Sequence, residues 1–360
     1  MSKRIYFVAG EASGDTHGAA LMSALHSLDQ TVEFIGRGGP RMRAIAGGDF
    51  TDWSEGSSVM GLVEVAKHYG YFRREFAATL AQIKHEQPDA VMLIDYPGFN
   101  LRLARALRQR GAKLKIIYYI SPQVWAWNRR RIPQMARSLD LMLCIFPFES
   151  ELYNQSGLRT VFVGHPMLET LAAKRTTEAR EPDLIGLFPG SRMREIRKIL
   201  PTMLLAMKGI TESRPNLRCE ISAASPALQR EIDNSIRSSG VPASVATASA
   251  ASLMQRAQVG MVASGTATLE AAFFGLPFVL VYRLAWLTYA AARVLVKVKH
   301  AGMPNVLAQR AIVPEFIQHK AQPEAIAAEV LRLLDDENHR GEMQTNFEEV
   351  IAKLGRGGAS

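Results

Sequence analysis

The sequence predicts an α/β protein of two doubly wound domains, each a parallel sheet between layers of helices. Short β-branched and aromatic runs alternate with longer amphipathic segments along the 360 residues. The apolar signal fades once, over residues 172–183, and a second series of strand-like runs follows. At roughly 100–200 residues per domain, this length fits two domains. With 48% hydrophobic and 21% charged residues, the composition excludes disordered and coiled-coil chains.

Each expected strand is a short apolar run, and most gaps between the strands have helical periodicity. In the first half we expect strands at 4–9, 31–35, 90–95, 114–120, 140–145 and 160–163. In the second half we expect strands at 184–188, 217–222, 258–263 and 277–282, with helices near 194–212, 226–238, 266–274 and 323–335. No short repeat is visible, which excludes solenoids and propellers.

The cysteine and hydropathy patterns restrict the class further. Two cysteines, Cys144 and Cys219, exclude a disulfide scaffold and a cysteine-built metal site, and they indicate a reducing compartment. The longest apolar run, 271–282, contains Gly275 and Pro277 and is too short to cross a bilayer. The first residues do not form a signal peptide, so we expect a cytoplasmic protein.

Positive charge is concentrated in one segment. The chain carries 43 Lys and Arg against 34 Asp and Glu, a net charge of +9. Between Asp95 and Asp140 there are ten basic residues and no acid. Most of these can be solvated helix faces, but the local field also favours an anionic partner such as phosphate, anionic lipid or nucleic acid.

Three strand ends of the first half carry polar side chains, and in doubly wound folds ligands bind beyond such ends. The loop 10–15 is rich in small residues, although a plain turn explains it equally well, and neither a Walker loop nor a dinucleotide fingerprint is present. Asp95 ends a buried strand, where a carboxylate either ties down its own turn or performs acid/base work. Trp125 and Trp127 follow another strand, where they either form a platform for a ligand or fill the core under the loop.

Two strand ends of the second half are typical of nucleotide sites. Gly190, Ser191 and Arg192 precede a helix, where amide donors, the helix dipole and a guanidinium suit a diphosphate. The small-residue turn 264–268 leads to Glu270, whose spacing does not fit a capping box. A carboxylate there can accept hydrogen bonds from both hydroxyls of a ribose. His17 and His165 are assigned no role, because lone histidines in turns usually make local hydrogen bonds.

These motifs, in this order, resemble those of the bacterial lipid-A-disaccharide synthases, glycosyltransferases of the GT-B fold. The resemblance rests on GEASGD (10–15), DYPGFN (95–100), SPQVWAW (121–127), FPFE (146–149), VGHP (163–166), PGSR (189–192), SGTATLE (264–270), PN (304–305) and PEFIQ (314–318). Phe188 and Met303 stand where leucine is usual, and both are minor exchanges of one apolar residue for another.

The resemblance implies two Rossmann-like domains facing a cleft. Residues 1–170 would bind the acceptor and contact the membrane, residues 171–336 would bind the UDP-sugar, and 337–360 would form a terminal helix, which in this fold often returns to the first domain. The implied reaction joins UDP-2,3-diacylglucosamine to 2,3-diacylglucosamine 1-phosphate with inversion, giving a β-1′,6-linked disaccharide phosphate and UDP. No Asp-x-Asp triplet is present, so we expect no metal and no cofactor.

The resemblance also supports a role for each strand end. We expect Asp95 to be the base and Arg192 to neutralise the departing diphosphate. The expected UDP-binding residues are Gly190, Ser191, Arg192, Ser264, Gly265, Thr266, Glu270 and Asn305. The expected acceptor-binding residues are Glu11, Ser13, Gly14, Asp15, Asn100 and Gln123, with Glu11 as the first reserve candidate for the base.

Acylated substrates imply access to a bilayer, so we expect peripheral association with the anionic cytoplasmic face of the inner membrane. The segment 59–83 has an apolar stripe with excess apolar residues, and its expected membrane contacts are Val59, Met60, Leu62, Val63, Tyr69 and Phe72. Packing on the sheet would give the same stripe. The segment 286–299 is a second candidate, or else packs between domains. We expect no nucleic-acid partner, and the choice between monomer and homodimer stays open.

Two other functions compete with this interpretation. A UDP-sugar 2-epimerase would use the same fold and would consume UDP-sugar without an acceptor. A basic nucleic-acid or membrane-surface binding protein would not depend on Asp95.

Overall fold

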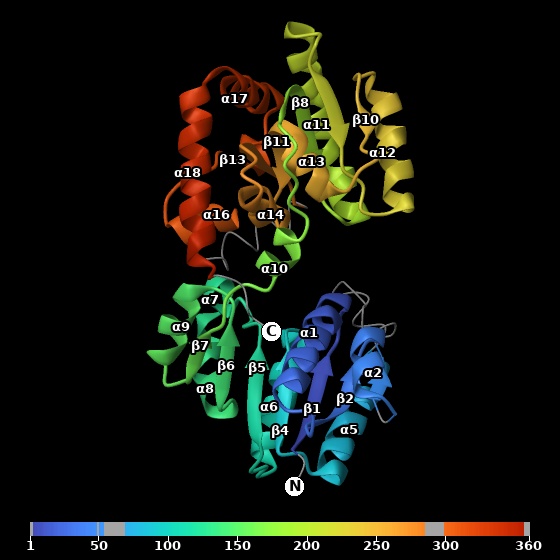
Figure 1. Ribbon diagram of the computed structural model, residues 1–360, viewed down its shortest axis with the longest axis vertical. Helices are drawn as coiled ribbons and strands as arrows, with labels where there is room; N and C mark the ends of the chain where they lie inside the picture. The colour runs from blue at the N-terminus through green and yellow to red at the C-terminus, as the bar shows by residue number, and fades with distance from the viewer. Residues whose placement is uncertain (1–2, 49, 54–68, 285–298, 356–360) are drawn as a thin grey trace. The chain divides into compact units, whose positions relative to one another are not determined.

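The computed structural model describes residues 3–48, 50–53, 69–284 and 299–355. The chain forms two compact units that divide between Pro166 and Met167, and the second unit continues to Gly355. Figure 1 shows each unit as a sheet flanked by helices. Among the described residues, no helix has both the length and the hydropathy that a bilayer span requires.

The first unit is a seven-stranded parallel sheet of order β3-β2-β1-β4-β5-β6-β7. Its strands are β1 (Arg4–Ala9), β2 (Glu33–Gly38), β3 (Phe50–Asp52), β4 (Ala90–Ile94), β5 (Lys115–Tyr119), β6 (Leu141–Cys144) and β7 (Thr160–Phe162). Its helices are α1 (Ala12–Leu28), α2 (Pro40–Ala46), α5 (Tyr69–Glu86), α6 (Pro97–Gln109), α7 (Val124–Trp127), η1 (Arg129–Arg131), α8 (Ile132–Ser138) and α9 (Pro147–Asn154).

The alternation of side chains along these strands builds a helical layer on each face. Tyr6 and Val8 of β1 join one buried cluster with Leu80 of α5, Leu103 of α6 and Met135 of α8. On the other face, α1 lies in contact with β1, since a Cβ on Gly14 would lie 3.4 Å from the Cβ of Ala9. The helices α5, α6 and α8 therefore share one face of the first sheet.

The second unit is a six-stranded parallel sheet of order β10-β9-β8-β11-β12-β13. Its strands are β8 (Glu181–Phe188), β9 (Arg218–Ile221), β10 (Ser244–Val245), β11 (Ala257–Ala263), β12 (Phe278–Tyr282) and β13 (Glu315–Ile317). Its helices are α10 (Met167–Ala172), α11 (Met193–Ser213), α12 (Pro226–Ser239), α13 (Ala250–Arg256), α14 (Ala267–Phe273), α16 (Met303–Ala308), η2 (Gln318–Lys320), α17 (Pro323–Asp335) and α18 (Glu337–Lys353). The terminal helix α18 packs on α14, α16 and α17, and the Phe347 ring stacks on Phe278 of β12 at 5.6 Å.

The expected strands all occur, with ends that differ by up to three residues. The sequence did not indicate β3, β10 and β13, because strands of two or three residues show little hydrophobic alternation; β7 is equally short but was expected at 160–163.

The expected membrane segment is only partly described. Val59, Met60, Leu62 and Val63 lie outside the described residues, as does all of the candidate segment 286–299 except Lys299. In α5, Leu80 and Ile83 are 5% and 3% exposed, and Phe76 packs on Phe99 at 5.5 Å. This part of the stripe therefore packs on the sheet, while Phe72 stays half-buried.

Candidate functional sites at the two switch points

The strand order creates one switch point in each sheet, where consecutive connections leave in opposite directions and ligands bind in doubly wound folds. In the first unit this point lies between β1 and β4, with Ala9 paired to Ile94. The next residues are Gly10 and Asp95, so two of the expected motifs meet at one sheet edge. In the second unit it lies between β8 and β11, with Phe188 paired to Val262, which brings 189–192 beside 264–270.

Asp95 sits on a strained turn. Asp95 and Tyr96 both have positive φ, 44° and 50°, which non-glycine residues rarely adopt. Three hydrogen bonds hold the Asp95 backbone: its N–H donates to the Tyr119 carbonyl at 3.0 Å, and its carbonyl accepts from the Tyr118 hydroxyl at 2.5 Å and from Asn100 Nδ2 at 2.9 Å. Each of these partners is itself buried, so the surrounding core maintains the strain.

The Asp95 carboxyl is electrostatically unusual. Its pKa is raised to about 6: burial is the largest cause, the nearby Glu11 carboxylate adds to the rise, and the hydrogen bond from the Tyr96 amide opposes it. Glu11 is the N-cap residue of α1 and is half-buried. A carboxylate with a pKa close to physiological pH, on a strained turn at a switch point, is suited to accept a proton from a substrate hydroxyl.

Gly10 and Tyr96 are fitted to each other. A Cβ on Gly10 would lie 2.3 Å from Cδ1 of Tyr96, so only glycine leaves room for that ring. Trp53 packs edge-on against Tyr96 at 6.2 Å, and its Nε1 donates to the Ala9 carbonyl at 2.7 Å. The aromatic pair thereby ties the end of β1 to the Asp95 turn.

Several expected acceptor residues are occupied with backbone contacts. Asp15 is 3% exposed, and its carboxylate accepts the amides of Gly39, Arg41 and Met42 at 2.9–3.1 Å, which caps the N-terminus of α2. Asn100 is fully buried. Asp15 therefore holds the start of α2, and Asn100 holds the Asp95 turn, from buried positions.

The other expected acceptor residues differ in their accessibility. Ser13 and Gln123 are exposed, whereas Gly14 is buried.

The two tryptophans of the 121–127 motif have different environments. Trp125 is 4% exposed, and its Nε1 donates to Oε1 of Glu149 at 2.8 Å, so it belongs to the core under the loop. Trp127 is 40% exposed, with the Arg131 guanidinium 5.0 Å above its ring. Glu149 is fully buried, which raises its pKa to about 7. Sequence reasoning missed Glu149 as a site-supporting residue, although a glutamate inside the apolar FPFE motif was a usable signal.

At the second switch point, a side chain of the protein occupies the expected diphosphate position. Glu195, in the first turn of α11, accepts hydrogen bonds from the Ser191 amide at 3.2 Å and from Arg192 Nη1 at 2.9 Å. Gly190 has a φ of 113°, and a Cβ there would lie 2.5 Å from Glu195 Oε2. Because Arg192 and Ser191 are exposed, an incoming anion can replace this carboxylate. Sequence reasoning did not identify Glu195.

The turn after β11, which lies beside this loop, carries further expected UDP residues. Ser264 is half-buried, and Gly265 and Thr266 are exposed. Burial raises the pKa of the Glu270 carboxyl, with Lys174 opposing the shift.

Asn305 is fully buried and has an internal role. Its Oδ1 accepts the amides of Ile312 and Val313, and its Nδ2 donates to the Val313 carbonyl and to Glu315. Asn305 therefore holds the loop between α16 and β13.

The fold places the chain in one structural class, that of the two-domain GT-B glycosyltransferases and the UDP-sugar enzymes of the same architecture. Solved structures with this fold include a UDP-GlcNAc 2-epimerase from Neisseria meningitidis bound to UDP-GlcNAc, with a TM-score of 0.61, 12% identity, and coverage of 98% of this chain and 99% of that one. The calicheamicin glycosyltransferase CalG4 has a TM-score of 0.57 at 14% identity, covering 99% and 95%. At these identities the likeness concerns the fold alone.

The family follows from closer relatives. The family model described as lipid-A-disaccharide synthetase matches residues 5–358. The lipid-A-disaccharide synthase of Geobacter metallireducens is 39% identical over all of this chain and 95% of that protein, and that of Myxococcus xanthus is 37% identical over 99% and 94%. The chain belongs to the lipid-A-disaccharide synthetase family and is a hexosyltransferase of lipid A biosynthesis, which confirms the resemblance seen in the motifs.

Proposed function

We propose that this enzyme transfers the diacylglucosamine of UDP-2,3-diacylglucosamine to the 6-hydroxyl of 2,3-diacylglucosamine 1-phosphate, with inversion at the anomeric carbon. The observation that carries the mechanism is the Asp95 carboxyl, held on a strained turn at the first switch point with a pKa of about 6. At neutral pH most of this carboxyl is ionised, and it is basic enough to take a proton from an attacking alcohol.

In the proposed step, the 6-hydroxyl oxygen attacks the anomeric carbon while Asp95 accepts the hydroxyl proton. The bond from the anomeric carbon to the β-phosphate oxygen breaks, and its electron pair leaves with UDP. Arg192 and the amides of Gly190 to Arg192 stabilise the developing diphosphate charge after Glu195 has been displaced. Ser264, Gly265 and Thr266 are secondary donors, and Glu270 accepts the ribose hydroxyls.

The acceptor site in this proposal is formed by Glu11, Ser13 and Gln123. The buried Asp15 and Asn100 act behind them by holding α2 and the Asp95 turn in place. Asn305 has the same indirect role for the UDP pocket.

We also propose that the enzyme works at the anionic cytoplasmic surface of the inner membrane, because both substrates carry acyl chains. Phe72 on α5 is half-buried and is available for such a contact. Sedimentation with vesicles of phosphatidylglycerol, compared with phosphatidylcholine, tests this association. Equal recovery in the supernatant with both lipids would refute it.

The test of the mechanism compares Asp95→Asn with Asp29→Asn, a control at an exposed turn between α1 and β2. We expect Asp95→Asn to lose at least about 100-fold in turnover while UDP affinity stays unchanged, and the control to retain full activity. Arg192→Ala should weaken both UDP binding and turnover. Retained turnover in Asp95→Asn would exclude the proposed base.

A second assay separates the transferase from a 2-epimerase of the same fold. UDP release from the acylated UDP-sugar should require the acceptor and should yield one disaccharide phosphate for each UDP. Consumption of the UDP-sugar without acceptor would favour the epimerase or a hydrolase.

A further inference from the structure

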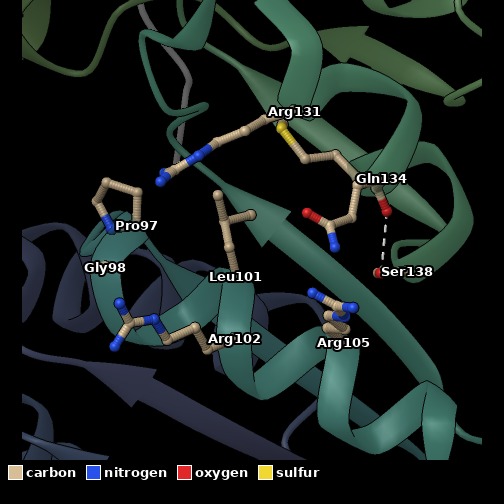
Figure 2. Close-up of a pocket in the computed structure, with 9 residues that line it drawn as sticks. Pro97, Gly98, Leu101, Arg102, Arg105, Arg131, Gln134 and Ser138 are labelled. Atoms are coloured by element: carbon tan, nitrogen blue, oxygen red, sulfur yellow. Dashed lines mark hydrogen bonds between the residues drawn. The ribbon is translucent and has the colours of Figure 1, made fainter. Parts of the chain in front are cut away.

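A groove lies between α6 and α8, on the face of the first sheet that α5 also covers. It encloses a cavity of about 210 Å³, and Figure 2 shows its walls. Its lining combines three arginines with two uncharged polar side chains and contains no acid; the residues are Pro97, Gly98, Leu101, Arg102, Arg105, Arg131, Gln134, Met135 and Ser138.

The three arginines of the groove have no acidic partner among the residues that the structure describes. Within the described part of the chain, Arg102, Arg105 and Arg131 form no ion pair. Arg108, one turn further along α6, is different: it pairs with Asp140 and donates to the Ala112 and Leu114 carbonyls at 3.0 Å. Guanidiniums gathered around one cavity repel each other unless an anion lies between them.

Two of these arginines, Arg131 and Arg105, extend across the groove. In Figure 2, Arg131 extends toward Pro97 at the start of α6, while the Gln134 amide and the Arg105 guanidinium point toward each other across the groove. Stacking of Arg131 over the Trp127 ring, at 5.0 Å, helps to fix its direction. Guanidinium and amide donors without an acid are the chemistry that recognises a phosphate group.

The groove begins next to the proposed base. Pro97 and Gly98 line it, and Gly98 is three residues after Asp95, so the chain between them spans at most about 11 Å. A sugar phosphate whose hydroxyl lies at Asp95 can therefore extend its phosphate toward the near end of the groove. The phosphate of a bilayer lipid would have the same chemistry but would require no link to Asp95.

We propose that the groove between α6 and α8 binds the phosphate group of the acceptor sugar while the attacking hydroxyl of that sugar lies at Asp95. The identity of this acceptor rests on the function proposed above. The groove is thus a specificity subsite that distinguishes a glucosamine 1-phosphate acceptor from an unphosphorylated one.

The test uses the double variant Arg102→Gln/Arg105→Gln. The matched control, Arg110→Gln/Arg137→Gln, removes the same charge from exposed positions of the same basic segment that do not line the groove. With 2,3-diacylglucosamine 1-phosphate, the groove variant should raise the acceptor KM at least tenfold. Its KM for the UDP-sugar and its kcat should stay within twofold of wild type, as should all three constants of the control. With 2,3-diacylglucosamine lacking the phosphate, wild type and groove variant should give the same acceptor KM.

Three outcomes would overturn the proposal. Equal losses in the groove and control variants would show a long-range field instead of a subsite. An unchanged acceptor KM would exclude the acceptor phosphate. An unchanged KM together with lost binding to phosphatidylglycerol vesicles would assign the groove to membrane lipid.

A binding measurement separates this proposal from the proposed function. Calorimetric titration of the full chain with glucosamine 1-phosphate, and with glucosamine as the reference, requires no catalysis. If wild type binds the phosphorylated sugar and the groove variant does not, the subsite is supported even where no transfer is detected. If neither protein distinguishes the two sugars, the subsite is refuted even where transfer occurs.

Discussion

Replacing the proposed catalytic base with asparagine should make the protein more stable at neutral pH. The Asp95 carboxyl is half-buried and close to Glu11, so ionising it in the folded state is unfavourable. Asparagine is uncharged, similar in shape and tolerant of the left-handed backbone that Asp95 adopts at a φ of 44°. The substitution therefore removes an electrostatic cost and keeps the turn.

The magnitude follows from the pKa of this carboxyl. Folding raises it from 3.8 to about 6, so between these pH values the folded protein binds more protons than the unfolded chain. Stability consequently falls as pH rises through this range. At about 1.4 kcal/mol per pH unit, the full cost above pH 6 is roughly 3 kcal/mol. The gain from Asp95→Asn should be roughly this large at pH 7.5 and should vanish below pH 4.

Thermal unfolding of wild type and Asp95→Asn from pH 4 to 8 checks this expectation. For a unit of this size, the gain corresponds to a Tm increase of about 6–12 °C at pH 7.5. Asp29→Asn, the exposed control, should give no such increase. Equal Tm values at pH 7.5 would refute the desolvation of Asp95. A gain that is the same at every pH would assign the effect to backbone preference instead of charge.

Three other substitutions test the surroundings of the two switch points. Glu11→Gln removes a negative charge beside Asp95, so the acid limb of the pH profile of kcat/KM, expected near pH 6 in wild type, should move to lower pH. An acid limb at the same pH would exclude an electrostatic coupling between Glu11 and Asp95. Gly10→Ala should cost about 1–3 kcal/mol of unfolding free energy in urea titrations, because the new Cβ meets the Tyr96 ring, and unchanged stability would show that the ring can move. Glu195→Gln should increase the affinity for UDP about two- to fivefold in calorimetry, because the Glu195 side chain, which occupies the diphosphate position, loses its charge. A lower affinity for UDP would contradict the role of Glu195 as an internal competitor.

The positions of the site loops could be predicted from sequence, because each follows a short apolar run that forms a strand. The meeting of these loops could not. The adjacency of β1 with β4, and of β8 with β11, depends on which strands pair across long connections, and no local pattern encodes such pairing.

Individual roles were harder to predict than locations. The amides that donate hydrogen bonds to Asp15 belong to residues 24–27 positions away in the sequence. The loop that Asn305 holds has no recognisable pattern of residue types either. Glu195 was overlooked because a glutamate in a first helical turn is usually explained by the helix dipole. For Asp95, the strain at positive φ is a property of the folded backbone and has no signal in the sequence.

The left-handed turn at the end of β4 has a practical consequence for engineering. Substitutions that relax Asp95 or Tyr96 would be enriched in any screen that rewards heat tolerance alone, because they remove strain and buried charge together. Such a screen would recover robust proteins that no longer make product. Improving this enzyme for use as a reagent therefore requires selecting for turnover in every round, or leaving the turn out of the library.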